Sequence, residues 1–296
     1  MEKLDYIPEK YLEGLPTSTS INSLKRIIEL TEKCICKIKC NDGGHGTGFF
    51  CNIYLDDWNF VRALITNYHV LNKNDISNGK KIEFSMNNEK ESFTLKIDET
   101  RKIFTNEIYD ITIIEINEND GLNRDSFLEI DNTIYDNDKM KNLEKHSIYL
   151  LHYPKEKGME FSKNIIQSID EYSNNIQHLC DSDIGSSGGP LINSINYKVI
   201  GIHKGGAKTQ NYNIGTLLKG PIEEFKKTFK NENKVIKTKL RGPKRQEQKE
   251  QRIMDIHEFK EEGEDFANCI REKDKDEEKI LDIDVPKRGK CGCSIF

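Results

Sequence analysis

A serine framed by glycines is the residue of this chain best suited to covalent chemistry. The segment Gly185-Ser186-Ser187-Gly188-Gly189-Pro190 stands just before an apolar run, LINS. A serine hydroxyl is a poor nucleophile that needs a base, a carboxylate that orients the base, and N–H donors for the oxyanion. Flanking glycines let a substrate carbonyl come close and leave the amides of Gly185 and Ser187 free to form an oxyanion hole. The alternative is an ordinary Gly-Ser turn without chemistry.

A histidine and an aspartate supply the groups that such a serine needs. His69 follows the apolar run ALIT, and Asp110 precedes the apolar run ITII. Taken separately, His69 has an alternative as a core histidine and Asp110 as a turn cap. With Ser187 they stand in the order His, Asp, Ser, which is the order of chymotrypsin-type enzymes. The sequence therefore predicts His69 as the general base, Asp110 as its orienting carboxylate and Ser187 as the nucleophile.

Short strands are the elements that must position these residues. From about residue 33 to 217 the chain alternates short apolar runs with polar turns rich in Asn and Asp, a pattern typical of an all-β barrel or sandwich. The runs are CICKIK, GTGFFCNIYL, VRALIT, KIEFSM, SFTLKI, ITIIEI, SIYLL and KVIGIH. Residues 1–32 are predicted to be a charged lead segment, helical in part over SLKRIIELTEK.

The chain is predicted to change character after residue 220. The run IEEFKKTFK follows Gly220-Pro221 and indicates a short closing helix with Pro near its first turn. Residues 231–290 consist largely of Lys, Arg, Glu and Asp, which is typical of a disordered or partly helical tail. The peptidase-like domain is thus expected over residues 33–230.

Composition excludes several other classes of protein. The 296 residues carry a formal net charge of −5, which argues against nonspecific nucleic-acid binding through overall charge. No apolar run is long enough to span a membrane, and the charged start MEKLDYIPEKYLEG does not resemble a signal peptide. The 8 cysteines have no regular pairing pattern. We therefore expect reduced thiols in a cytosolic protein.

Five ordered motifs carry a resemblance to trypsin-like (chymotrypsin-fold) serine peptidases, nearest the compact glutamyl-endopeptidase and bacterial-type members. The motifs are GTGFF (46–50), LITNYHVL (64–71), YDITIIEI (109–116), CDSDIGSSGGPLIN (180–193) and VIGIHKGG (199–206). The resemblance implies two six-stranded antiparallel β-barrels with a His69-Asp110-Ser187 triad between them. It also implies that the amides of Gly185 and Ser187 hold the oxyanion, and that neither a metal nor an organic cofactor takes part.

Two departures from the digestive enzymes matter. Those enzymes have Asp before the catalytic serine, and it pairs with a new N-terminus after zymogen cleavage. Here that position is Ser186, and no activation segment of the IVGG type is present. Val70 follows His69 where those enzymes have a disulfide-forming Cys. We therefore expect neither activation through a liberated N-terminus nor that disulfide.

Substrate preference rests on two residues that point to opposite charges. Asp181 occupies the place where trypsin-like enzymes carry an acidic pocket base for Lys or Arg, although relatives without that preference have it too. His203 matches the pocket histidine with which glutamyl endopeptidases receive an acidic side chain. The alternative is that Asp181 caps a turn and His203 ends a strand. The sequence leaves the choice open.

The cysteines near residue 36 are better explained by packing than by metal binding. Strand periodicity places Cys34, Cys36 and Cys40 on one face. Along a strand, Cys34 and Cys40 would lie roughly 20 Å apart, whereas zinc needs every sulfur within about 2.3 Å. We expect these thiols to pack as small hydrophobes.

The last four residues, Cys293-Ser294-Ile295-Phe296, fit a prenylation box whose terminal Phe favours a geranylgeranyl group. Lys287, Arg288 and Lys290 are nearby, and Cys291 offers a second lipidation site. Residues 291–296 are therefore predicted to anchor the protein to the cytosolic face of a membrane.

Together these features predict an intracellular serine endopeptidase that acts on protein or peptide substrates and is tethered to a membrane, with no nucleic-acid partner. The first alternative is an inactive trypsin-like pseudopeptidase that binds peptides at a membrane. A second is a tethered adaptor whose interactions run through the charged tail.

Overall fold

The computed structural model describes residues 16–155, 157–207 and 210–240, with side chains described as far as residue 230. The chain divides into a unit of Met1–Asn233 and a unit of Lys234–Phe296. Apart from the end of the last helix, everything described below belongs to the first unit. The predicted tail beyond residue 240 and the predicted lipid site at Cys293 lie outside the described residues.

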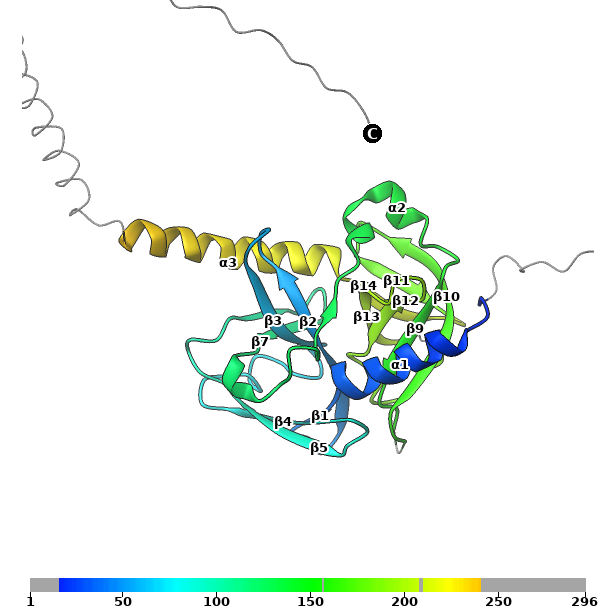
Figure 1. Ribbon diagram of the computed structural model, residues 1–296, viewed down its shortest axis with the longest axis horizontal. Coiled ribbons are helices and arrows are strands. Elements are labelled where there is room, and N and C mark those ends of the chain that lie inside the picture. The colour runs from blue at the N-terminus through cyan, green and yellow to red at the C-terminus, as the bar shows by residue number, and fades with distance from the viewer. Residues whose placement is uncertain (1–15, 156, 208–209, 241–296) are drawn as a thin grey trace, which may run out of the picture. The chain divides into compact units, whose positions relative to one another are not determined.

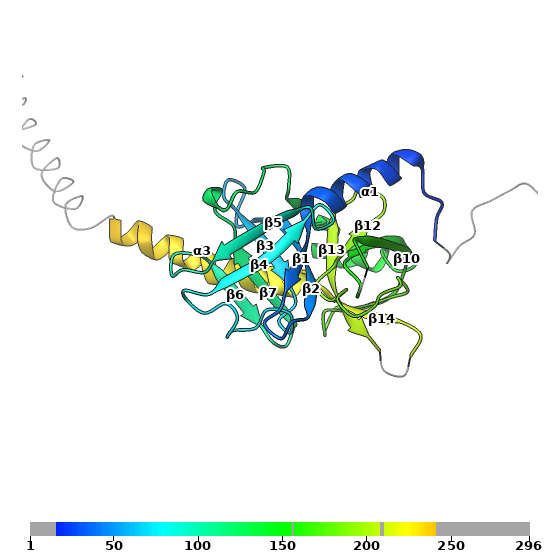
Figure 2. The ribbon, with the colours of Figure 1, turned by 90° about the horizontal axis from the view of Figure 1, so that it is seen from below.

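Two β-sheets dominate the first unit, and they lie side by side in Figures 1 and 2. The first follows the strand order β5-β4-β1-β2-β3-β7-β6, with β8 paired to β2. Its strands are β1 (Ile35–Lys39), β2 (His45–Tyr54), β3 (Phe60–Thr66), β4 (Lys81–Met86), β5 (Glu91–Lys96), β6 (Ile103–Asn106), β7 (Ile111–Glu115) and β8 (Leu128–Glu129).

The second sheet is a closed barrel in the order β10-β11-β14-β13-β12-β9. Its strands are β9 (Ser147–His152), β10 (Glu160–Asp170), β11 (Asn175–His178), β12 (Pro190–Asn193), β13 (Val199–Gly206) and β14 (Asn213–Leu217). All its strand pairs are antiparallel. The predicted all-β, chymotrypsin-like architecture is thus confirmed.

The first sheet differs from the closed six-stranded barrel that the resemblance implied. It is curled but open, and β8 pairs with β2 in parallel. The outer strand β5 exposes most of its side chains, among them Glu91 and Lys96. Charged side chains on an edge strand discourage further pairing.

Helices and short 3₁₀ turns connect and cover the sheets. They are α1 (Ile21–Cys34), η1 (Glu118–Asp120), η2 (Asn132–Tyr135), α2 (Asn137–Lys141) and α3 (Lys219–Leu240). The Ser20 side chain caps α1 by accepting from the Ser23 amide, and α1 buries Ile27 and Leu30. The expected closing helix is present but longer than IEEFKKTFK, because α3 continues to Leu240. No helix in residues 16–155, 157–207 and 210–240 is long and apolar enough to cross a membrane.

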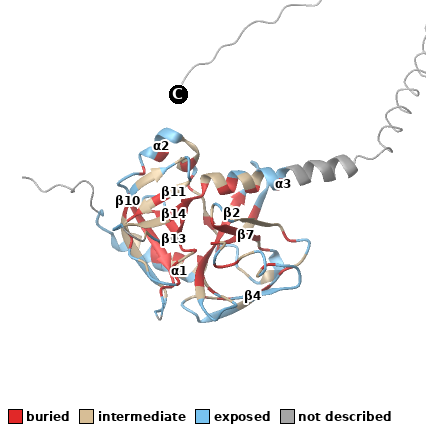
Figure 3. Ribbon diagram, turned by 180° about the vertical axis from the view of Figure 1, so that it is seen from behind, coloured by how far each residue is buried: buried red, intermediate tan, exposed pale blue. Residues whose placement is uncertain are grey.

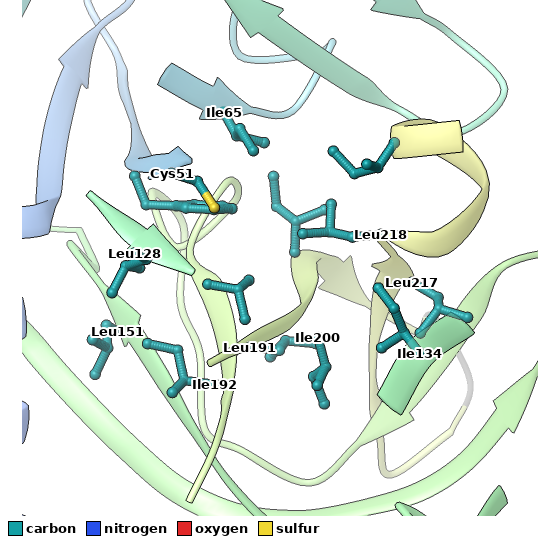
Figure 4. Packing of buried hydrophobic residues seen from close by; sticks show 14 of the residues in the cluster. Cys51, Ile65, Leu128, Ile134, Leu151, Leu191, Ile192, Ile200, Leu217 and Leu218 are labelled. Carbon is teal, nitrogen blue, oxygen red and sulfur yellow. The ribbon is translucent and has the colours of Figure 1, made fainter. Parts of the chain in front are cut away.

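The main apolar core joins the two sheets. Figure 4 shows Cys51 of β2 and Ile65 of β3 in the same cluster as Leu191 and Leu217 of the barrel. Figure 3 shows the buried residues concentrated inside the sheets and on the inner side of α3. Apolar burial of this kind stabilises the placement of the two sheets against each other. The loops at their junction are therefore held in place as well.

One cysteine lies in a different element from the predicted one. Cys34 is the last residue of α1 rather than part of a strand, because the helix runs directly into β1. Cys34, Cys36, Cys51 and Cys180 are buried free thiols, and Cys40 is half-buried. Burial raises the pKa of the Cys34 thiol to about 12 and that of Cys40 to about 11. These cysteines therefore pack as neutral, unreactive side chains.

Candidate active site

His69 and Asp110 are in direct contact in the first sheet. His69 follows the end of β3, Asp110 precedes β7, and the two strands are paired. The Nδ1 atom of His69 lies 2.7 Å from Oδ2 of Asp110, and the backbone amide of His69 donates to Oδ1 at 2.9 Å. Both carboxylate oxygens of Asp110 are thus hydrogen-bonded to His69. This geometry fixes the tautomer of His69 with its proton on Nδ1 and leaves Nε2 as an acceptor.

The backbone of Asp110 is held in an unusual conformation that aims its carboxylate. Its φ of 53° lies in the left-handed region, which Asp tolerates better than most residues. The Asn67 side-chain amide donates to the Asp110 carbonyl at 2.9 Å. On the other side, Thr216 of β14 donates its hydroxyl to the Tyr109 carbonyl at 2.7 Å. Contacts from both sheets therefore stabilise this turn.

Glu224 of α3 also supports the aspartate loop, which the sequence did not predict. Its two carboxylate oxygens accept from the Tyr109 hydroxyl at 3.0 Å and from the Asn106 side-chain amide at 3.1 Å. In the sequence, Glu224 reads as an exposed residue of a helix. Its spacing does not indicate a partner more than a hundred residues earlier in the chain. The closing helix thus reaches the loop that carries Asp110.

Thr47 of β2 connects the histidine strand to the serine loop. The Thr66 hydroxyl, at the end of β3, donates to the Thr47 carbonyl at 2.7 Å. The Thr47 amide donates to the Ser187 carbonyl at 2.8 Å. A Cβ atom at Gly188 would overlap the Thr47 carbonyl oxygen, so only glycine fits there. Hydrogen bonds through Thr47 therefore connect the backbone of Ser187 to Thr66, at the end of the strand that leads to His69.

The Ser187 hydroxyl is accessible and lightly held. Ser187 is half-buried, and its Oγ donates to the carbonyl of Lys204 on β13 at 3.2 Å. In the described part of the chain, no hydrogen bond joins Ser187 Oγ to His69. Catalytic hydrogen bonds are often formed only when substrate is bound.

The loop before Ser187 has the shape of an oxyanion hole. The Ser186 amide donates to the Asp183 carbonyl at 3.0 Å, which closes a four-residue turn. Gly185, the third residue of that turn, has a φ of 92°, the value that a type II turn requires. Neither the Gly185 amide nor the Ser187 amide has a hydrogen-bond partner among the described residues. Both donors are free for an oxygen that carries developing negative charge.

A second histidine–serine contact lies beneath this loop, and the sequence did not predict it. His152, the last residue of β9, places Nδ1 2.6 Å from the Oγ of Ser186. His152 is 3 % exposed and Ser186 is 0 % exposed. Burial lowers the pKa of His152 to about 4, so the ring is neutral at pH 7. In the sequence, YLLH reads as the apolar end of a strand and does not indicate this contact.

The two residues predicted to select the substrate lie in different surroundings. Asp181 is exposed and lines a polar surface pocket of about 410 Å³ beside His152. His203 on β13 is 2 % exposed, and its Nδ1 lies 3.1 Å from Nε2 of the buried His178. Burial holds the pKa of His203 well below its usual range, and the nearby imidazoles of His178, His152 and His69 lower it further. No contact joins Asp181 to His203 in the described ranges.

The model of the peptidase S39 family matches residues 27–228. This match covers both sheets and every residue of the predicted site. The chain belongs to the peptidase S39 family. It is therefore a serine-type endopeptidase with a chymotrypsin fold.

Solved structures support the fold of this S39 peptidase. The chain is similar to the serine endoprotease from Yersinia pestis, with a TM-score of 0.50 and 15 % identity over 71 % of this chain and 68 % of that one. At such identity the likeness speaks for the fold alone. No curated protein sequence matches the chain.

The described residues of this peptidase offer no metal site. No group of three or more His, Cys, Asp or Glu side chains gathers within metal-binding distance in residues 16–155, 157–207 and 210–240. The groups that do gather, His69 with Asp110 and the glycine-framed loop of Ser187, are those of acyl transfer to a serine.

Proposed function

We propose that this S39 peptidase hydrolyses peptide bonds through His69, Asp110 and Ser187. Ser187 Oγ attacks the scissile carbonyl while His69 Nε2 takes its proton and then gives it to the leaving amine. Asp110 keeps the Nδ1 proton in place and stabilises the imidazolium that forms. The amides of Gly185 and Ser187 bind the oxyanion of the tetrahedral intermediate.

The observation that carries this proposal is the link between the two halves of the site. The His69–Asp110 pair is held at 2.7 Å in the first sheet. The Thr47 backbone then connects the end of β3, at Thr66, to the Ser187 carbonyl. A rigid connection of this kind supports the correct spacing of base and nucleophile, which accounts for much of the catalytic effect of an enzyme.

For the residue before the cut, we propose an acidic side chain received by His203. His203 directly precedes Lys204, whose carbonyl accepts from Ser187 Oγ, so it lies on the strand that borders the nucleophile. His178 Nδ1 has no hydrogen-bond partner among the described residues, which favours the tautomer in which His178 Nε2–H donates to His203 Nδ1. His203 then carries its proton on Nε2 and can donate it to a carboxylate. Asp181 faces the separate pocket beside His152.

Labelling with a fluorophosphonate probe tests the catalytic proposal. We expect the wild type to label and Ser187→Ala and His69→Ala to lose labelling and peptide hydrolysis by about four orders of magnitude or more. Ser173→Ala, in the exposed turn between β10 and β11, is the matched control and should label fully. Failure of folded wild type to label would favour the peptide-binding pseudopeptidase. Digestion of a peptide library then tests whether cleavage follows Asp and Glu or, against the His203 proposal, Lys and Arg.

We also propose a geranylgeranyl anchor at Cys293, which would place the peptidase on the cytosolic face of a membrane. Its support is the sequence Cys-Ser-Ile-Phe and the lysines and arginine before it. Intact-mass measurement after incubation with a prenyltransferase and geranylgeranyl diphosphate tests it. The adduct should form on wild type and on Cys291→Ser but not on Cys293→Ser. Unmodified wild type would contradict the proposal.

A further inference from the structure

We propose that His152 is a positioning residue that holds residues 183–187 in the shape of the oxyanion hole through its contact with Ser186. The inference rests on the proposed function, because it assigns the oxyanion hole to the amides of Gly185 and Ser187. Ser186 stands between those two amides in the chain. A change in the placement of Ser186 therefore moves both donors at once.

The hydrogen bonds around Ser186 determine which atom donates. The Asp183 amide donates to Ser186 Oγ at 3.0 Å, so the hydroxyl oxygen already accepts. The one remaining proton of the hydroxyl has a single acceptor within reach, His152 Nδ1 at 2.6 Å, among the described residues. The imidazole must therefore leave Nδ1 unprotonated and carry its proton on Nε2. Burial keeps the ring neutral at pH 7, which this arrangement requires.

The first sheet holds the backbone on either side of Ser186. Thr47 of β2 donates its hydroxyl to the Gly185 carbonyl at 2.8 Å and its amide to the Ser187 carbonyl at 2.8 Å. Both bonds engage carbonyl groups and leave the side chain of Ser186 free. Without His152, the hydroxyl of Ser186 would be a buried donor without an acceptor, which is costly. The turn could relieve that cost by rotating the peptide group before Gly185.

Burial distinguishes the contact between His152 and Ser186 from that of a nucleophile with its base. Ser186 is 0 % exposed, so its Oγ cannot meet a substrate carbonyl unless the loop unfolds. No carboxylate is hydrogen-bonded to His152 within the described ranges, whereas His69 has Asp110. The arrangement at His152 thus lacks both the access and the orienting carboxylate that a catalytic base needs.

The contact also bears on whether the loop needs proteolytic activation. In the digestive enzymes that the sequence resembles, the residue before the nucleophile needs a newly released N-terminus as its partner. Here Ser186 has a partner within the folded chain, at the end of β9. The oxyanion loop is therefore expected to be in its active shape without proteolytic processing.

Two substitutions at position 152 separate the Nδ1 contact from the bulk of the ring. Asn places an acceptor oxygen near the position of Nδ1, whereas Gln places its amide near Nε2 and offers nothing at Nδ1. We expect His152→Gln and Ser186→Ala to lower kcat and the rate of fluorophosphonate labelling by about 10- to 100-fold, with KM nearly unchanged. His152→Asn should retain most of the activity, and circular dichroism should confirm that each variant is folded.

Hydrogen–deuterium exchange gives a readout that does not depend on catalysis. We expect faster exchange in the peptide that covers residues 183–189 of His152→Gln, and little change in His152→Asn. Exchange and labelling at wild-type rates in His152→Gln would overturn the proposal, as would a rise in KM alone or equal losses in Asn and Gln.

Mass spectrometric mapping of the phosphonyl adduct separates this inference from the proposed function. An adduct on Ser187 agrees with both. An adduct on Ser186 would overturn both, because Ser186 would then be the nucleophile. If wild type does not label at all, the proposed function fails, and the exchange experiment still decides the role of His152.

Discussion

His69 and His152 are both assigned to the proposed site, yet their surroundings are opposite. The His69 side chain is 48 % exposed and is bonded to a carboxylate, whereas His152 is 3 % exposed and is bonded to a hydroxyl. A histidine that must become charged during a reaction needs solvent and a nearby negative charge. A histidine that must only accept a hydrogen bond is better buried, because burial keeps it neutral. The different surroundings of the two histidines thus give the same type of side chain two different roles.

The two sheets likewise contribute different parts of the proposed site. The first sheet supplies His69 and Asp110 on loops that follow or precede paired strands, and the closed barrel supplies Ser187 and its supporting contacts. In the proposed mechanism, the open sheet carries the groups that exchange protons, and the closed barrel carries the loop whose shape must not change.

Breaking the His69–Asp110 contact should have the largest effect. Asp110→Asn replaces an acceptor by a group that can present N–H to Nδ1, which favours the wrong tautomer of His69. We expect kcat to fall by about 10⁴-fold with the fold intact. Measured kcat of His152→Asn is the comparison, because the introduction of an amide at the buried contact is expected to be mild. A loss of less than tenfold in Asp110→Asn would contradict the role given to Asp110.

Filling the space at Gly185 should have the next largest effect. Gly185 has a φ of 92°, and a Cβ atom there would lie 2.6 Å from the Tyr153 carbonyl oxygen. We expect Gly185→Ala to displace the loop and to lower kcat by about 10²- to 10³-fold.

Gly79→Ala is the matched control for Gly185→Ala. Gly79 has a φ of 84° but nothing lies within 4 Å of the added carbon. It should lose about 1 kcal/mol of stability through backbone strain and retain full activity. Denaturant unfolding and peptide hydrolysis of both variants measure the two effects. Equal kinetic effects in the two variants would show that strain, not the loop, is responsible.

The pH dependence of stability gives the smallest expected effect. Burial lowers the pKa of His152 from 6.5 to about 4, so the unfolded chain binds this proton more readily than the folded one. The contribution of His152 to stability is complete above pH 6.5 and is lost as the pH falls toward 4. Between pH 7 and 5, the free energy of unfolding should fall by about 2 kcal/mol more in wild type than in His152→Asn. Equal falls, measured by urea unfolding at both pH values, would contradict a neutral, buried His152.

Much of the site was readable because its signals are local. The glycine-framed Ser187, the strand that ends before His69 and the strand that begins after Asp110 are each visible in a few consecutive residues. Strands such as β2, β3 and β7 were visible for the same reason, since alternating apolar residues and polar turns are local patterns. The helix predicted over SLKRIIELTEK followed from its spacing and is present as part of α1.

The parts that were missed depend on residues far apart in the chain. The contact of His152 with Ser186 and that of Glu224 with Tyr109 each join two elements that only the packed sheets bring together. The open edge of the first sheet depends on which strands pair, not on the strands themselves. Cys34 was assigned to a strand because helix and strand meet there without a turn.

The sequence by itself determined the residue types, their order along the chain and the glycines that allow the serine loop to turn. These follow from chemistry and from short-range preferences, such as the freedom of glycine at positive φ. Only the tertiary structure decided that an exposed His69 meets the buried Asp110, while His152 meets Ser186 in the interior. Burial is a property of the whole packed domain, and it is burial that makes one imidazole a candidate base and the other a neutral support.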